Sequence, residues 1–380
     1  MRSSNVSDLK IETLVLQSTP FCNIDCSYCY LPDRASKILM SEQTLARTFD
    51  CVFSSPFIGD HLSVLWHAGE PLVAGLEYYR RAFDILEQYR PPAVSVTCHF
   101  QTNGTLLNQA WVDFFVSKGC KIGLSLDGPA DLHDQSRRTR SGKGTFERTM
   151  LGLRTLQANN FPFHVITVLT RDSLRSADRL FEFYVGNGIE QIAFNVEEIE
   201  GIHASSSLDS EQIGSQMRNF LRRFLDLIAQ SRPRLSVREF DGAFHAIVNP
   251  ASCDYGNPMA EPLRFVSVGV KGELSTFSPE LLGSKSRQYP SFVFGNVHQN
   301  QLVDILSNPQ FERVNFDIEE GVQNCRASCD YFNVCLGGVP GNKLFENGSF
   351  ATCETLFCRL SKKAVVDVVL ERVENNLGLI

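Results

Sequence analysis

The chain has 380 residues, of which 43% are hydrophobic and 21% are charged, and its formal net charge is −7. This length allows a full hydrophobic core and roughly two domains. The negative charge gives no electrostatic footprint for a nucleic-acid backbone, so we expect no nucleic-acid partner. No apolar run is long enough to span a bilayer, and the first residues lack the apolar core of a signal peptide. We therefore expect a cytoplasmic protein without a membrane partner.

The first two-thirds of the chain alternates short apolar runs with longer amphipathic segments. The apolar runs predict strands at 14–16, 62–66, 94–100, 121–126, 164–169 and 191–195. Helical patterns follow these strands at 41–52, 76–89, 109–118, 146–157, 177–186 and 211–229. Six such units with right-handed crossovers predict an α/β fold, a partial (βα)6 TIM-like barrel with its active residues at the carboxyl ends of the strands.

The periodicity weakens after residue 234, and turn residues and cysteines become frequent. This change predicts a barrel domain over 1–234, a second domain over 235–360 and a closing helix over 361–380. The stretch from Cys325 to Cys358 is rich in glycine and irregular in pattern, so we expect this stretch to lack a large core of its own. A bound metal would supply the missing stability.

Three cysteines directly after the first strand, Cys22, Cys26 and Cys29, form the pattern C-x3-C-x2-C. Thiolates at this spacing can hold three irons of a 4Fe-4S cluster and leave the fourth iron open. A structural zinc site would need a fourth protein ligand, and no second Cys or His pair lies nearby. With the aromatic Tyr28 before the last cysteine, the motif resembles the signature of the radical S-adenosylmethionine (SAM) enzymes. The resemblance implies that the open iron binds SAM and that its reductive cleavage yields a 5′-deoxyadenosyl radical.

The resemblance extends to the ends of the next strands. The segment 66–71 resembles the Gly-Gly-Glu-Pro motif of these enzymes, in which Gly69 lets the backbone approach the methionine moiety and Glu70 accepts from its ammonium group. The same resemblance implies SAM contacts for three further residues, namely Asn103, Ser125 and Arg137. Taken singly, the Asn-Gly and Asp-Gly-Pro sequences at these strand ends are ordinary turns.

A second group of cysteines lies near the carboxyl end of the chain. Its spacing resembles the C-terminal half of a SPASM domain, the auxiliary-cluster module of radical SAM enzymes that modify ribosomally made peptides. The resemblance implies one auxiliary 4Fe-4S cluster with the ligands Cys325, Cys329, Cys335 and Cys358. Cys353 is the alternative fourth ligand, and a zinc site with the same thiolates is the alternative metal centre.

The chain departs from a full SPASM module in the residues that would hold a second, proximal cluster. Of those cysteines only Cys253 is present, while Phe277 and Val339 occupy two of the other positions. We therefore expect one auxiliary cluster, with the role of Cys253 open. The chain also resembles the anaerobic sulfatase-maturating enzymes, but Ser278 stands where that resemblance would place a catalytic Asp. This substitution counts against formylglycine formation.

Strings such as 275–283 and 342–350 resemble the cyclophane-forming peptide maturases of the GrrM/OscB group. The resemblance implies a ribosomally synthesised precursor peptide as partner and an electron donor such as flavodoxin or ferredoxin. It also implies a C–C crosslink between an aromatic ring and the Cβ of a residue two positions away. The ring must then lose a proton to a base, and the candidate bases are Glu197, Glu198 and Glu280.

Two kinds of alternative remain open. The same scaffold could host thioether formation, epimerisation or formylglycine-type oxidation, because function belongs to the site rather than the fold. A non-catalytic zinc or iron binding module is the alternative from another class. Such a module would have no use for the residues that resemble SAM contacts.

Overall fold

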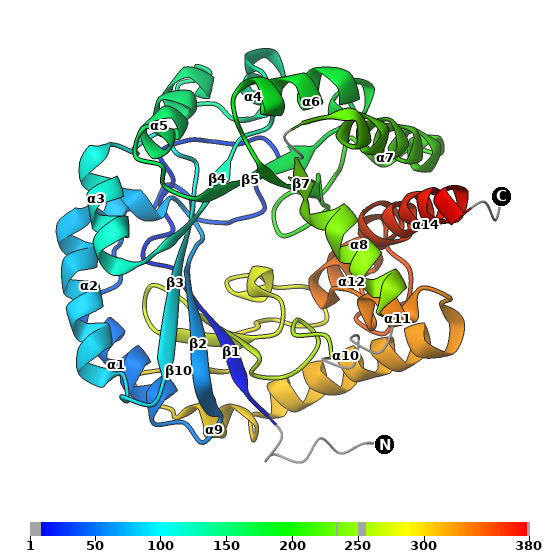
Figure 1. Cartoon of the computed structure of the whole chain (residues 1–380). Coiled ribbons are helices and arrows are strands. Elements are labelled where there is room, and N and C mark those ends of the chain that lie inside the picture. Colours follow the sequence, from blue (N-terminus) through cyan, green and yellow to red (C-terminus); the bar gives the residue numbers. More distant parts are fainter. Residues whose placement is uncertain (1–8, 233–234, 250–255, 378–380) are drawn as a thin grey trace.

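The computed structural model describes residues 9–232, 235–249 and 256–377, so Cys253 lies outside the described residues. One ten-stranded sheet runs through these residues in the order β10-β9-β8-β1-β2-β3-β4-β5-β6-β7 (Figure 1). The strands are β1 (Ile11–Leu16), β2 (Ile58–Trp66), β3 (Ser95–Thr102), β4 (Lys121–Ser125), β5 (Phe163–Leu169), β6 (Gln191–Val196), β7 (Ser236–Val237), β8 (Phe265–Val268), β9 (Glu273–Thr276) and β10 (Gly295–Asn296).

Strands β1 to β7 are parallel and neighbour one another in chain order. The connecting helices are α1 (Glu42–Phe53), α2 (Leu76–Tyr89), α3 (Gln109–Lys118), α4 (Ala130–Ser136), α5 (Phe146–Ala158), α6 (Ala177–Gly186) and α7 (Ile213–Gln230). They line the outside of the curved sheet (Figure 1). The six predicted strands and six predicted helices are all present, whereas the short α4 was not predicted.

The sheet continues across the expected domain boundary at residue 234. Strand β7 pairs with β6 on one edge, and β8 pairs in parallel with β1 on the other side of the barrel strands. Strands β9 and β10 then extend the sheet in antiparallel register. The segments after residue 234 therefore share the barrel's backbone hydrogen bonds.

Of the remaining helices, α9 lies at the bottom of the view, and the other labelled ones gather on the side of the ring opposite α1 to α3 (Figure 1). The remaining helices are α8 (Arg238–Val248), α9 (Leu302–Ile305), α10 (Pro309–Ser328), α11 (Phe332–Cys335), α12 (Pro340–Asn347), α13 (Leu356–Cys358) and α14 (Ala364–Leu377). The predicted closing helix begins with a π-helical turn at Arg359–Lys363 and continues as α14. Helix α14 packs against α7 and α8.

The second domain contains buried pairs of aromatic side chains. The rings of Phe277 and Phe311 stack with centroids 5.8 Å apart, and those of Tyr289 and Phe350 lie 5.0 Å apart. All four side chains are buried. Aromatic burial, which dominates core energetics, therefore stabilises this region together with any bound metal.

Aromatic side chains also fill the space between the barrel strands and their helices. Tyr79 of α2 packs edge-on against Trp66 of β2 and Phe100 of β3, with ring centroids 5.0 and 4.9 Å apart. This packing fixes the carboxyl ends of β2 and β3 relative to each other, which is where the predicted SAM contacts begin. Within the described residues, no helix is long and apolar enough to cross a membrane.

Candidate active site

The three predicted cluster ligands lie in the loop that follows β1. Cys22, Cys26 and Cys29 are all partly exposed, and the loop is held by hydrogen bonds from Cys22 N to Arg34 O and from Cys29 N to Cys26 O. Burial, the largest cause in each case, raises the pKa of the Cys22 and Cys26 thiols to about 12. The Arg137 guanidinium acts in the opposite direction on the pKa of Cys26. Metal binding would deprotonate these thiols.

The end of β2 packs directly on this cysteine loop. Gly69 has a φ of +69°, and a Cβ there would lie 2.4 Å from Thr19 O and 2.7 Å from Phe21 O. The backbone N–H of Glu70 donates to Phe21 O at 2.9 Å. Because both the backbone angle and the available space exclude a side chain, this position requires glycine.

The Glu70 carboxylate is buried and joins the ends of β2 and β3. It accepts hydrogen bonds from Thr102 Oγ1 at 2.7 Å, Asn103 N at 2.8 Å and Leu72 N at 3.0 Å. Burial raises the pKa of Glu70 to about 7, although these three donors oppose the shift. Two carboxylate oxygens offer about four acceptor positions, so one position remains for an external donor.

Asn103 joins the end of β3 to the cysteine loop. Its Nδ2 donates to Asn23 Oδ1 at 2.9 Å and lies 3.8 Å from Cys22 Sγ. Its Oδ1 accepts from Thr105 N and from the Thr105 hydroxyl. Asn103 therefore contacts one predicted cluster ligand through a side chain whose orientation is fixed by its other bonds.

A buried ion pair follows β4. Arg137 Nε donates to Asp127 Oδ2 at 2.9 Å, and the Tyr28 hydroxyl donates to the same oxygen at 2.5 Å. The guanidinium also lies over the Tyr28 ring, 5.5 Å from its centroid. Ser125 Oγ accepts from Gln101 Nε2 at 2.9 Å. The predicted residues Tyr28 and Arg137 thus meet through Asp127, which the sequence did not single out.

The three predicted bases have different surroundings in the structure. The acceptor positions of the Glu197 carboxylate are largely taken by donors of the protein. It pairs with His203 Nε2 at 3.2 Å and accepts hydrogen bonds from both the backbone N–H and the hydroxyl of Ser207. Glu198 accepts from Asn342 Nδ2 at 2.7 Å through one oxygen only. Glu280 has a buried Oε2 with no hydrogen-bond partner among the described residues.

Burial, with nearby acidic groups, changes the acidity of these carboxyls. The pKa of Glu198 is raised to about 8, first by burial and then by the charges of Glu280 and Glu346. Burial also raises the pKa of Glu280 and, with help from Glu280 and Glu198, that of Glu200. Burial raises the pKa of Tyr30, the residue after the last loop cysteine, and the charges of all three carboxylates raise it further. The structure therefore brings Glu198 and Glu280 to the cysteine loop and leaves Glu197 bonded elsewhere.

The C-terminal cysteines gather around the end of α10. Cys325 lies in its last turn, Cys329 caps it and Cys335 ends α11. Cys325 Sγ lies 3.5 Å from Cys353 O, and both Cys353 and Cys335 act on the pKa of Cys325, which burial raises. Cys358 Sγ accepts from Thr355 N at 3.4 Å.

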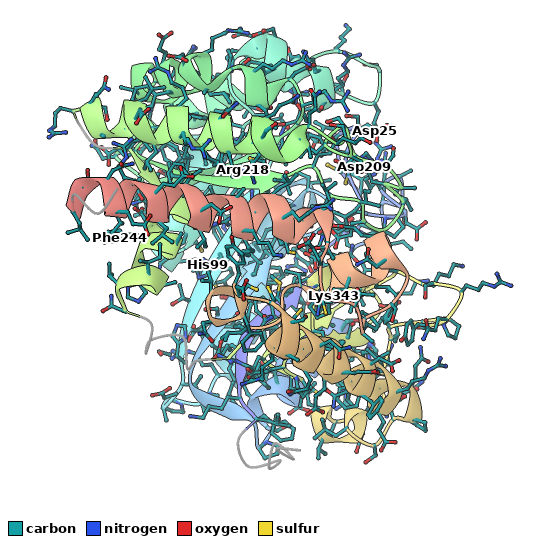
Figure 2. The ribbon with its side chains drawn as sticks, turned by 90° about the vertical axis from the view of Figure 1, so that its right-hand side faces the viewer. Asp25, His99, Asp209, Arg218, Phe244 and Lys343 are labelled. Carbon is teal, nitrogen blue, oxygen red and sulfur yellow. The ribbon has the colours of Figure 1, made fainter. Side chains whose placement is uncertain are left out.

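A buried lysine contacts this second group of cysteines. The Lys343 ammonium donates to Gly321 O at 2.8 Å and to Cys325 Sγ at 3.3 Å, and the side chain is only 3% exposed. Figure 2 shows Lys343 among the C-terminal segments. Within the described residues, no carboxylate forms an ion pair with Lys343.

Comparison with known proteins adds an independent observation. Residues 16–184 match the family model described as the radical SAM superfamily. An uncharacterized protein of Synechocystis sp. is 42% identical over 370 residues, which is 96% of this chain and 93% of the relative. Residues 16–184 thus form a radical SAM domain.

More distant relatives include enzymes with assigned activities. The cysteine-type anaerobic sulfatase-maturating enzyme of Clostridium perfringens is 22% identical over 86% of this chain and 88% of its own length. A solved structure of anSMEcpe with bound AdoMet has a TM-score of 0.78 at 20% identity and covers 96% of this chain and 98% of that chain. Streptococcus suis SuiB bound to the precursor peptide SuiA has a TM-score of 0.63 at 17% identity over 92% of this chain and 76% of that chain. The fold is therefore the radical SAM partial barrel with an anSME-like C-terminal region.

The residues present fit the cofactors of this superfamily. Within the described ranges, no three His, Cys, Asp or Glu side chains converge closely enough for a single metal ion. A four-iron cluster spreads its thiolates more widely than one ion does, and three thiols on one loop suit it. The radical SAM domain thus uses a 4Fe-4S cluster and SAM. At the second group, the unpaired ammonium of Lys343 fits an anionic, metal-bound thiolate at Cys325.

Two hollows lie beside the C-terminal segments. A cavity of about 800 Å³ lies between α7 and the C-terminal segments, where Asp209 and Arg218 line it (Figure 2). A smaller cavity of about 210 Å³ is lined by Ile199 and Glu346 and shares Asp209 with the larger one. Ile199 lies between Glu198 and Glu200 in the sequence, and the charge of Glu346 raises the pKa of both.

Proposed function

We propose that this radical SAM enzyme matures a ribosomally synthesised precursor peptide by joining an aromatic ring to the Cβ of a nearby residue. The observation that carries the proposal is the position of Glu198, a carboxylate with a raised pKa near the loop of Cys29 and Tyr30. Ring coupling needs a base at this place, because the ring must release a proton after the new bond forms. The similarity to peptide-bound SuiB and to sulfatase-maturating enzymes supports a peptide as substrate.

Cys22, Cys26 and Cys29 would hold the SAM-binding cluster, which with SAM supplies a 5′-deoxyadenosyl radical able to remove hydrogen from an unactivated carbon. We propose that Glu70 offers its remaining acceptor position to the SAM ammonium, beside the close approach at Gly69. Asn103, Ser125 and the Tyr28–Arg137 pair would line the rest of the SAM pocket. These side chains orient SAM, and their mutual hydrogen bonds fix their positions before SAM binds.

The overall reaction removes two hydrogens from the peptide. One leaves the Cβ as a hydrogen atom and ends in 5′-deoxyadenosine, while the ring releases one proton and one electron as it regains aromaticity. We propose that Glu198 takes the proton, because only one of its oxygens is bonded to Asn342. Glu197 is a poorer base, since three donors already occupy its carboxylate.

Cys325, Cys329, Cys335 and Cys358 would hold one auxiliary 4Fe-4S cluster whose chemistry is to accept that electron. Cys353 is the alternative to Cys358. An external reductase such as flavodoxin or ferredoxin would supply the electron that SAM cleavage consumes. Reconstituted protein should then hold about eight irons, four for each cluster. Replacing the three loop cysteines by Ala should remove half of the iron, whereas about four irons in the unaltered protein would contradict the second cluster.

The experiment that tests the reaction uses a candidate precursor peptide with deuterium at the Cβ to be joined. Each turnover should transfer one deuterium to 5′-deoxyadenosine and lower the peptide mass by the two lost atoms. Transfer from Cα without a change in the unlabelled peptide's mass would instead indicate epimerisation. A product that reacts with a hydrazide reagent would indicate formylglycine-type oxidation. A product in which a cysteine can no longer be alkylated by a thiol reagent would indicate a thioether. A protein with zinc and no iron-sulfur absorption would indicate a non-catalytic metal module.

A further inference from the structure

Three buried oxygen atoms near Tyr30 have no hydrogen-bond partner among the described residues. They are Oε1 of Glu200, Oε2 of Glu280 and Oδ1 of Asn342. Glu200 is 4% exposed and Asn342 is fully buried. All three atoms are acceptors. Buried polar atoms are nearly always paired in folded proteins, so three unpaired acceptors in one region indicate a missing donor group.

Three separate segments bring these atoms together. Glu200 follows β6 in a turn closed by hydrogen bonds between the backbones of Glu200 and His203. Gly201, with a φ of +55°, holds this turn against Tyr30, because a Cβ there would lie 2.4 Å from Tyr30 O. Glu280 lies in the short 3-10 helix Pro279–Leu281 after β9. The position of Glu200 is therefore fixed by the contact of its turn with Tyr30, which follows the cysteine loop.

Helix α12 supplies the third atom and lies on the inner side of the C-terminal segments (Figure 1). Gly341 at its start leaves room for Glu200, since a Cβ at Gly341 would lie 3.0 Å from Glu200 Oε1. The Asn342 amide donates its Nδ2 to Glu198 and leaves Oδ1 free. An amide oxygen without a partner thus lies near the carboxylates. This finding does not depend on the charge of the carboxylates.

The protein groups around these atoms cannot satisfy them. Within the described residues, neither Glu200 Oε1 nor Glu280 Oε2 has a hydrogen-bond partner, and neither carboxylate forms an ion pair. The nearby groups that act on Glu200 are Glu198, Glu280 and Glu346, all of them acidic. Lys362 acts on Glu198 without forming an ion pair with it. Among the described residues, the charged groups that act on Glu200 are therefore all acidic, and no protein donor reaches the three oxygens.

We infer that these oxygens form a subsite for a cationic side chain of the substrate peptide, the ammonium of a lysine or the guanidinium of an arginine. Either group presents at least three N–H donors, which matches three acceptors, and its charge compensates the carboxylates. The subsite adjoins Tyr30 and Glu198, so a bound cation would anchor the peptide beside the loop that carries the cluster ligands. This inference rests on the proposed function in that the substrate is a peptide.

The test measures binding of short peptides to the reconstituted enzyme in the presence of SAM. The probes are acetylated and amidated Gly-Gly-Lys-Gly-Gly and Gly-Gly-Arg-Gly-Gly, with norleucine and citrulline versions as neutral controls. Calorimetry should show that at least one cationic peptide binds roughly tenfold tighter than its neutral counterpart. The member of the pair that shows this preference distinguishes an ammonium subsite from a guanidinium subsite.

Glu200→Gln and Glu280→Gln should each reduce the preference to about twofold or less, because each removes one charged acceptor. Glu319→Gln, an exposed carboxylate on α10, is the matched control and should leave it unchanged. The absorption spectrum of the clusters checks that each variant is folded. If Glu200→Gln loses its clusters, the binding preference of Glu280→Gln alone tests the subsite. Equal binding of cationic and neutral peptides, or a preference that survives in both variants, would overturn the inference.

SAM cleavage measured without peptide separates this inference from the proposed function. Formation of 5′-deoxyadenosine without a preference for cationic peptides would overturn the subsite alone. A clear preference in a protein that never cleaves SAM would overturn the proposed reaction and leave the subsite standing.

Discussion

Asp127 and Arg137 form a buried ion pair in which Oδ2 and Nε lie 2.9 Å apart. The second carboxylate oxygen of Asp127 accepts from Val168 N at 3.0 Å, so the pair also joins the ends of β4 and β5. Burial lowers the pKa of the Arg137 guanidinium, but the negative charges of Asp127, Tyr28 and Cys26 outweigh this effect and raise that pKa. One buried pair thus connects the sheet to the predicted cluster loop.

Arg137→Met should destabilise the protein by about 3–5 kcal/mol, because it leaves the Asp127 carboxylate buried without its partner. Asp127→Asn should have an effect of the same sign. The double variant should lose less than the sum of the two single variants, since each single change already breaks the pair. Urea unfolding measures these differences. Arg179→Met, which breaks an exposed pair with Asp131, is the control and should cost below about 1 kcal/mol.

Glu70→Gln should weaken SAM binding while the absorption of the iron-sulfur clusters persists. The amide keeps the size of the side chain but turns an N–H₂ group toward one of the donors from Leu72, Thr102 or Asn103. We also expect a loss of stability of about 1–3 kcal/mol from the unmade bond. Equilibrium dialysis with SAM measures the affinity, and Glu77→Gln on the exposed face of α2 is the control. An unchanged SAM affinity would show that Glu70 does not hold the SAM ammonium.

Lys343→Met should lower the midpoint potential of the auxiliary cluster. Removal of a positive charge and a hydrogen bond at Cys325 Sγ makes the reduced, more negative cluster less favourable. A redox titration followed by electron paramagnetic resonance measures the potential. Lys121→Met removes an exposed lysine on β4, so it is the control. If both variants keep the original potential, Lys343 has no influence on a cluster at Cys325.

The crosslinking rate should rise with pH through about 8, the pKa of Glu198, because only the carboxylate can take the ring proton. Glu198→Gln should remove this dependence and most of the activity. The same shift affects stability in the opposite direction. Between about pH 4.5 and 8 the folded protein holds a proton that the unfolded chain releases, so stability should fall as pH rises through this window. A rate profile that is flat from pH 6 to 9 would exclude Glu198 as the base.

The sequence predicted what depends on local spacing. The loop of Cys22, Cys26 and Cys29 and the strand ends at Glu70 and Asn103 follow from short motifs, and the structure places all of them together. The cyclophane reaction and the ligand sets remain proposals. The alternation of strands and helices could also be predicted from the sequence, because each strand and helix buries an apolar face that appears as a periodic pattern of apolar residues.

The sequence could not predict contacts between distant segments. Lys343 reads as an ordinary surface lysine until α12 packs against α10 and brings it to Cys325. Glu200 lies in a turn without periodicity, and its unpaired oxygen is recognisable only once Gly341 is placed beside it. Glu197 was predicted as a base because it ends a strand, but the following turn brings Ser207 back to its carboxylate.

The most direct test of the proposed reaction is the mass of the precursor peptide after anaerobic incubation with the enzyme, SAM and a reductant. We predict a loss of two hydrogens per turnover, no reaction of the product with a hydrazide reagent, and no backbone fragmentation between the two joined residues in tandem mass spectrometry. A variant with Ala in place of Cys22, Cys26 and Cys29 should leave the peptide unchanged. An unaltered peptide mass with the intact enzyme, or a product that fragments freely between those residues, would contradict the crosslink.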